Sequence, residues 1–149
     1  MIMTKEEKYL SLLPQVRSLC EGEDDMVAKM ANVAALLHSE FHFWWTGFYR
    51  VVESELLLGP FQGPIACVHI AYGRGVCGTA WKEGRTLVVP DVEEFPGHIA
   101  CSAASRSEVV VPMKKDDHII AVLDIDSECL ATFDDVDAHY LEQIVSCMV

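Results

Sequence analysis

The chain has 149 residues, and 11 Lys and Arg against 23 Asp and Glu give it a formal charge of −12 with the six histidines neutral. That length suits one domain, and 51% hydrophobic residues with a mean hydropathy of +0.21 are too apolar for a disordered chain. At a pI of about 4.7 the chain repels phosphate backbones and anionic lipid, so neither nucleic acid nor a membrane surface is expected as a partner.

The sequence also lacks a membrane-targeting pattern. No run of about 18 uninterrupted apolar residues is present, so no segment is expected to cross a bilayer. Charged residues occupy positions 5–8, where a secretory signal needs an apolar core. The expected location is therefore the cytoplasm, where six cysteines are thiols or buried apolar residues rather than structural disulfides.

The first 38 residues predict helices. Thr4 and Glu7 have capping-box spacing ahead of an apolar stripe, although Pro14 should bend or break this first helix. The acidic residues within 21–25 favour a second helix start. The two apolar stripes at near-helical period are Leu10, Leu13, Val16 and Leu19, then Met26, Val27, Met30, Val33, Ala34 and Leu37.

Shorter apolar runs then predict a sheet, because they are rich in β-branched and aromatic residues and are separated by turn residues. The expected strands are 43–52, 56–58 (ended by Gly59 and Pro60), 66–70, 86–89, 108–113 and 119–125, the last two joined by a hairpin turn at 114–118. One or two helical turns are expected at 79–83, and a final helix opens at Thr132 and Asp134.

The order of elements predicts a single α+β domain over residues 1–149, with helices on one face of the sheet. It divides into a helical part at 1–40, a sheet core at 41–127 and a C-terminal helix at 132–148. Residues 90–107 form a long connection with two prolines, and loops of this length inside compact domains usually have a function.

A Gly-x-Gly-x-x-Gly pattern spans residues 73–78 after a predicted strand and raises the question of a dinucleotide site. A parallel strand–helix–strand unit needs a dozen or more residues for its crossover, and the next strand begins at Thr86. We therefore interpret the glycines as a tight turn that brings Cys77 close to another segment.

The six cysteines show no Cys-x-x-Cys spacing, which argues against a zinc ribbon. Cys20, Cys129 and Cys147 are interpreted as incidental or buried apolar residues. Cys67, Cys77 and Cys101 instead lie at strand ends and in loops. Cys101 is either an ordinary free cysteine or a thiol activated by the nearby cations His98 and Arg106. A metal site made by Cys67, His69, His98 and Cys101 is a further alternative without recognisable ligand spacing.

Three acids make a second candidate group. Asp124 and Asp126 end a strand and share a face because side chains alternate along a strand. Glu108 begins the neighbouring strand, so the three could surround one cavity, hold an ammonium group and supply a proton. Trp44 and Trp45 are adjacent in a predicted strand, so only one of them should face that cavity.

Several segments together resemble the free methionine-(R)-sulfoxide reductases, which are single GAF-domain enzymes. The similarity runs in register from about Trp44 to Ser127. The segments that carry it are Gly59-Pro60-Phe61-Gln62-Gly63 to Cys67, Gly75-Val76-Cys77-Gly78-Thr79-Ala80, Pro96-Gly97-His98-Ile99-Ala100-Cys101, Ser107-Glu108 and Val122-Leu123-Asp124-Ile125-Asp126-Ser127.

The resemblance implies a GAF-like fold with a six-stranded antiparallel sheet flanked by helices, usually as a homodimer. It implies reduction of free L-methionine-(R)-sulfoxide, with thioredoxin as the external reductant and no bound cofactor or metal. Carried over by position, Cys101 is the nucleophile, Cys67 the resolving thiol and Cys77 a second candidate partner. The substrate-binding residues implied in the same way are Trp45, Glu108, Asp124 and Asp126.

Two other functions stay open from the sequence alone. A GAF module can bind a small ligand as a sensor and catalyse nothing, although such a sensor has no need of a nucleophile and two resolving thiols. A zinc-dependent hydrolase with Cys and His ligands would contain stoichiometric metal when purified.

Overall fold

The computed structural model describes residues 2–98 and 104–149. Six strands form one sheet in the order β3-β2-β1-β6-β5-β4, and all neighbouring strands are antiparallel. The α+β class and the six-stranded sheet that the sequence predicted are confirmed. The strands are β1 (Trp45–Val52), β2 (Glu55–Gln62), β3 (His69–Ala71), β4 (Leu87–Val89), β5 (Ser107–Lys115) and β6 (His118–Ser127).

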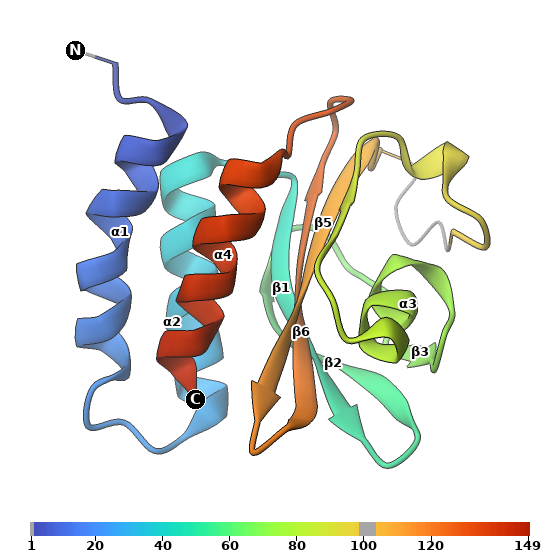
Figure 1. Cartoon of the computed structure of the whole chain (residues 1–149), viewed down its shortest axis with the longest axis horizontal. Coiled ribbons are helices and arrows are strands. Elements are labelled where there is room, and N and C mark those ends of the chain that lie inside the picture. Colours follow the sequence, from blue (N-terminus) through green and yellow to red (C-terminus); the bar gives the residue numbers. More distant parts are fainter. Residues whose placement is uncertain (1, 99–103) are drawn as a thin grey trace.

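In the part of the chain that the structure describes, four α-helices lie on the two sides of this sheet (Figure 1). α2 and α4 pack directly against strands, α1 packs outside them against both helices, and α3 lies on the opposite side. The prediction that helices cover one face is therefore wrong for α3. The helices are α1 (Lys5–Cys20), α2 (Met26–Phe41), α3 (Gly75–Glu83) and α4 (Asp135–Met148), and a short 3-10 helix, η1 (Val92–Glu94), follows β4.

The sheet divides the buried side chains into two cores, because alternate residues of a strand face opposite sides. Along β5 the side chains of Val109 and Val111 enter the core beneath α2 and α4, whereas Val110 faces α3. Along β6 the side chains of Leu123 and Ile125 enter the same core beneath α2 and α4. The side facing α3 therefore receives the side chains of positions 108, 124 and 126.

Helix α1 differs from its prediction in two ways. The capping box of Thr4 and Glu7 is present, but the helix continues through Pro14 to Cys20. Pro14 is exposed, so the carbonyl group that loses its N–H partner faces water. The buried stripe is Tyr9, Leu12, Leu13, Val16 and Cys20, while the predicted Leu10 and Leu19 are 52% and 37% exposed.

The other helix ends agree better with the sequence. Asp25 caps α2 by accepting a hydrogen bond from the backbone of Ala28, and Asp134 caps α4 through a capping box. Val27, in the predicted stripe of α2, is 50% exposed. α3 begins at Gly75 rather than at Thr79 and ends, as predicted, before Gly84.

Strand β2 extends beyond the Gly59 and Pro60 pair that was expected to end it. The pairing of β1 with β2 shifts register between Gly47 and Tyr49. Gly59 and Pro60 of β2 therefore form a bulge opposite this part of β1. Proline, which has no N–H for the ladder, is tolerated at such bulges. β3 in turn is shorter than predicted and begins only at His69.

The glycine pattern at 73–78 lies at the start of α3, between β3 and β4. Those strands are at opposite edges of the sheet, so the parallel unit of a dinucleotide site is absent here. A Cβ atom on Gly78 would lie 2.7 Å from the Ala71 carbonyl oxygen, which explains a glycine at this close approach. Among the described residues, none of the helices has both the length and the apolar character needed to cross a bilayer.

Candidate active site

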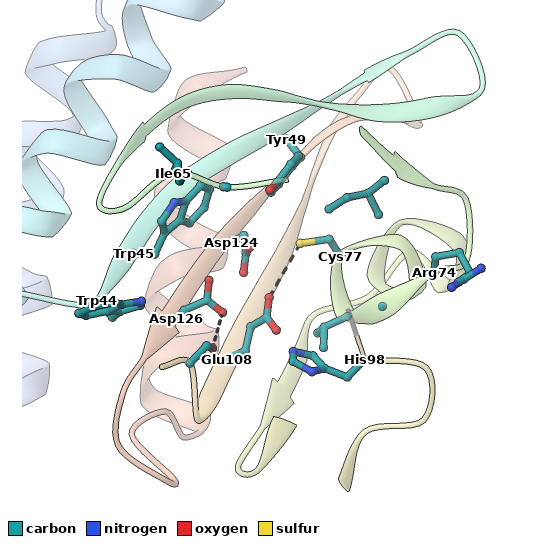
Figure 2. A pocket seen from close by; sticks show the side chains of 15 residues that line it. Trp44, Trp45, Tyr49, Ile65, Arg74, Cys77, His98, Glu108, Asp124 and Asp126 are labelled. Carbon is teal, nitrogen blue, oxygen red and sulfur yellow. Dashed lines mark hydrogen bonds between the residues drawn. The ribbon is translucent and has the colours of Figure 1, made fainter. Parts of the chain in front are cut away.

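One pocket lies between the α3 side of the sheet, the start of α3, the connection from β2 to β3 and the segment that follows β4 (Figure 2). Its floor is made by β1, β5 and β6, and Cys77 of α3 forms one wall. The pocket brings together Trp45, Cys77, Glu108, Asp124 and Asp126, which lie in four separate segments of the sequence.

The three acids come together through strand register. Glu108 pairs directly with Asp126 across β5 and β6, and Asp124 lies two residues earlier on the same face. This confirms the prediction that period two gathers the acids, but they are more enclosed than a cavity mouth. Glu108 and Asp124 are each only 6% exposed, and Ser105 Oγ donates to Asp126 Oδ1 at 3.2 Å.

Burial and mutual repulsion change the acidity of this group. Loss of water raises the pKa of Glu108 well above its usual range, and the neighbouring charges of Asp124 and Asp126 raise it further. Burial also raises the pKa of Asp126 well above its usual range, with the charge of Asp124 adding to it. The pKa of Asp124 rises by burial too, opposed by hydrogen bonds from Glu108 and Cys77. Burial and the neighbouring charges therefore favour a protonated carboxyl group in the pocket.

Cys77 shares the pocket with these acids. It lies in the first turn of α3, is 4% exposed, and its Sγ atom lies 3.9 Å from Glu108 Oε2. Burial raises the pKa of this thiol well above its usual range, and the charges of Asp124 and Glu108 raise it further. Cys77 is therefore a protonated thiol unless a cation or a reaction partner removes its proton.

Aromatic side chains form the wall opposite the thiol. Trp45 is 4% exposed and stacks on Tyr49 and Phe61, with ring centroids 5.8 and 5.2 Å away. A Cβ atom on Gly47 would lie 2.3 Å from the Phe61 Cβ atom, so only glycine fits between these rings. Trp44 also lines the pocket, against the prediction of opposite orientations, because β1 begins at Trp45 and strand alternation does not include Trp44.

Two of these aromatic residues also hold the connection between β2 and β3. Trp45 Nε1 donates to the Pro64 carbonyl at 3.1 Å, and the Tyr49 hydroxyl donates to the Cys67 carbonyl at 2.9 Å. Cys67 is half-buried and disulfide-bonded. The predicted nucleophile, Cys101, lies outside the described residues.

The alternative metal site predicted from Cys67, His69, His98 and Cys101 does not agree with the described geometry. His69 lies on β3, outside the pocket, and its Nδ1 is 2.6 Å from Glu55 Oε1. His98 does line the pocket, and partial burial lowers its pKa against the opposing charge of Asp124. Among the described residues, the group with metal-binding geometry is Cys77, Glu108 and Asp124.

The other predicted incidental cysteines lie elsewhere. Cys20 is buried beneath the helices, Cys147 packs against the same core, and Cys129 is exposed after β6. All three are free thiols.

Several residues that line the pocket were not predicted from the sequence. Tyr49 follows Trp45 by four residues on the same strand face, so the period-two rule that grouped the acids also identifies it. Arg74 and Ser105 lie in loops, where no periodicity indicates the direction of a side chain. The exposed Ile65 at the pocket edge is equally without a signal in the sequence.

Comparison with known proteins identifies relatives of this chain. The GAF domain family model matches residues 20–148. GAF domain-containing protein A of Dictyostelium discoideum is 56% identical over 97% of this chain and 92% of its own length. Free methionine-R-sulfoxide reductase of Escherichia coli is 46% identical over 97% of this chain and 88% of its own.

A solved structure is similar over nearly the whole chain. The X-ray structure of free methionine-R-sulfoxide reductase from Neisseria meningitidis, in complex with its substrate, has a TM-score of 0.96 and 50% identity. The match covers 99% of this chain and 90% of that one.

Proposed function

This chain belongs to the free methionine-(R)-sulfoxide reductase family of GAF-domain proteins, and from that premise we propose that it reduces free L-methionine-(R)-sulfoxide to L-methionine. One structural observation supports the proposal independently of the relatives' names. Three acids and an aromatic wall share a pocket in which Glu108 and Asp124 are almost fully buried. Such a pocket suits a small zwitterion with an apolar end.

The acids have two tasks in this proposal. A free amino acid presents an ammonium group, which an ionised carboxylate binds through a charge-assisted hydrogen bond. A sulfoxide sulfur accepts a nucleophile only when its oxygen is protonated or hydrogen-bonded, so the second task is to supply a proton. Glu108 suits that task, because burial and the neighbouring acids raise its pKa and favour its protonated form.

The aromatic wall suits the other end of the substrate. The S-methyl group of the sulfoxide is apolar and would lie against Trp45, whose ring is fixed by stacking on Tyr49 and Phe61. Contacts between sulfur or methyl groups and aromatic rings are favourable. Fixing the methyl group and the ammonium group at opposite ends of the pocket would orient the sulfoxide for one epimer.

The redox steps belong to the cysteines. The Cys101 thiolate attacks the sulfoxide sulfur, the oxygen passes to Cys101 as a sulfenic acid, and methionine leaves. Cys67 then attacks the sulfenic sulfur, which releases water and forms a disulfide. A disulfide-bonded Cys67 is compatible with this resolving role. Cys77 remains a candidate second disulfide partner.

Thioredoxin is proposed as the reductant that restores both thiols by thiol–disulfide exchange, so no bound redox cofactor takes part. Such exchange needs access to the disulfide. The residues beside Cys67 are exposed, including Ile65 at 91% and Val68 at 50%, which supports access for a protein partner. We further propose that the enzyme acts in the cytoplasm as a homodimer, protecting the methionine pool under oxidative stress.

The proposal is tested by following NADPH consumption with thioredoxin and thioredoxin reductase. Three substrates are compared: free methionine-(R)-sulfoxide, its (S) epimer and a peptide-bound sulfoxide. We expect turnover on the free (R) form alone. Turnover on the peptide would contradict the substrate class, and binding of the free sulfoxide without any turnover would identify a sensor instead.

A further inference from the structure

Cys77 is a pocket thiol that the proposed pair of Cys101 and Cys67 does not require. It is free, and its sulfur faces carboxyl groups on two strands. One ligand atom each from Cys77, Glu108 and Asp124 lies within 4.8 Å of the other two. Figure 2 shows the Cys77 sulfur and these two carboxyl groups between Trp45 and His98.

Asp124 supplies a second and independent observation. Its Oδ1 atom is buried and has no hydrogen-bond partner within residues 2–98 and 104–149, although the residue is only 6% exposed. Leaving a buried carboxylate oxygen unpaired is costly, and native proteins rarely tolerate it without a functional reason. The atom belongs to a side chain that lines the pocket, so a cation entering there would satisfy it.

We propose that Cys77, Glu108 and Asp124 bind one Zn²⁺ ion, and that this ion excludes substrate from the pocket. Zinc accepts thiolate and carboxylate ligands together, whereas Mg²⁺ and Ca²⁺ prefer oxygen alone. Tetrahedral zinc needs ligand atoms about 3.5 Å apart. The Cys77 and Glu108 atoms are 3.9 Å apart, so small side-chain rotations complete the site.

The charge balance also favours this ion. The bound thiolate and two carboxylates carry three negative charges, which offset the two positive charges of zinc within a buried volume. The formal charge of −12 attracts cations to the chain as a whole. Three protein ligands leave the fourth zinc position open toward the pocket, where water or an added ligand binds.

The inhibitory part of this inference rests on the proposed function. If Asp124 and Glu108 bind the methionine sulfoxide, zinc and the sulfoxide require the same atoms and cannot bind together. Zinc would then act as a reversible inhibitor rather than a resident cofactor. The zinc site itself depends only on the positions of its three ligands.

Equilibrium dialysis against Zn²⁺ tests the site directly, using the disulfide form so that Cys67 cannot act as a ligand. We expect one zinc ion per chain. Cys77→Ser should weaken binding by more than about tenfold, because even the outer partners of metal ligands are worth about 10–100-fold. Asp124→Asn is a second variant, and Cys129→Ser, at an exposed free thiol, is the matched control that should bind normally.

Two readouts separate this inference from the proposed function. Co²⁺ in place of Zn²⁺ should give a thiolate charge-transfer absorption that Cys77→Ser abolishes, without any need for turnover. In the same disulfide form, whose nucleophile is not available to consume the sulfoxide, free methionine-(R)-sulfoxide should weaken zinc binding at the Cys77 site.

Zinc binding that survives Cys77→Ser, or that depends on Cys129, would overturn the site. Simultaneous binding of zinc and sulfoxide would overturn the claim of exclusion. If the wild-type protein reduces methionine sulfoxide normally but binds no zinc at Cys77, this inference alone is contradicted. A Cys77-dependent zinc site in a protein that reduces no sulfoxide contradicts the proposed function alone.

Discussion

Buried carboxylates on the two sides of the sheet differ in whether they have hydrogen-bond partners. On the helical side, Asp137 of α4 is 1% exposed and fully engaged. It accepts hydrogen bonds from Lys5 Nζ at 2.7 Å and from the Tyr9 hydroxyl at 2.6 Å, and its Oδ2 also accepts from the backbone of Asp134. On the pocket side, Asp124 Oδ1 has no described partner, and the side chain lies beside Glu108 and the Cys77 thiol.

The difference separates a structural acid from a functional one. Asp137 joins α1 to α4, and its partners offset the cost of removing its charge from water. Asp124, Glu108 and Asp126 repel one another and gain stability only when a proton or a ligand enters. A buried polar group without a hydrogen-bond partner is therefore a better indicator of a functional site than a buried polar group that is fully paired.

The largest effect is expected from the cysteines of the reaction. Cys101→Ser should abolish turnover, because serine is not oxidised by a sulfoxide. Cys67→Ser should allow one fast round and then slow recycling, since the sulfenic acid lacks its partner. Cys147→Ser, on the helical side, is the control and should keep full activity in the same coupled assay. Normal steady-state turnover by Cys101→Ser would disprove the mechanism.

Matched alanine substitutions test the comparison itself. Asp137→Ala leaves the buried Tyr9 hydroxyl without its acceptor, so we expect the free energy of unfolding to fall by about 2–4 kcal/mol. The activity of the remaining folded protein should be unchanged. Asp124→Ala should show the reverse, with lost turnover and no loss of stability in urea unfolding. Equal losses of stability in both variants would mean that Asp124 is structural.

Glu108→Gln sharpens the comparison through its pH dependence. The folded-state pKa of Glu108 is raised, so the wild-type protein loses stability as pH rises from the unfolded pKa toward the folded one. Glutamine does not ionise and avoids that loss. We expect the variant to be more stable than wild type at pH 8, with the difference disappearing near pH 4, where the wild-type carboxyl group is protonated in both states.

Thermal unfolding at both pH values measures this effect, and the coupled assay should show reduced turnover by the same variant. A Glu108→Gln protein that loses stability and activity together at pH 8 would assign Glu108 a structural role.

Strand periodicity explains why much of the pocket was predictable. The alternation along 122–126 and the position of Glu108 on the next strand identify the acidic face, since local spacing determines it. The sequence does not show that β1 begins at Trp45, and the orientation of Trp44 depends on that boundary. The pairing of Asp137 with Lys5 joins the two ends of the chain, and no local pattern contains it.

The helical errors have a similar origin. In α1 the predicted stripe through Leu10 and Leu19 is rotated from the buried one, which contains Tyr9 and Cys20. Tyrosine is buried here because α4 supplies an acceptor for its hydroxyl. That tertiary contact, absent from the local sequence, decides which face of α1 packs inward.

The smallest effect is expected from Tyr49, whose hydroxyl donates to the Cys67 carbonyl at 2.9 Å. Tyr49→Phe removes that donor while keeping the buried ring. A hydrogen bond of about 1 kcal/mol corresponds to roughly a fivefold change in rate, if the bond holds Cys67 ready to attack. We expect slower disulfide closure, measured by trapping the sulfenic acid with dimedone, and an unchanged first reduction of sulfoxide. Tyr140→Phe removes an equivalent hydroxyl, bonded to Glu6 at 2.8 Å on the helical side, and should change neither step. If Tyr49→Phe slowed the first reduction as much as the closure, its hydroxyl would serve the substrate pocket and not the position of Cys67.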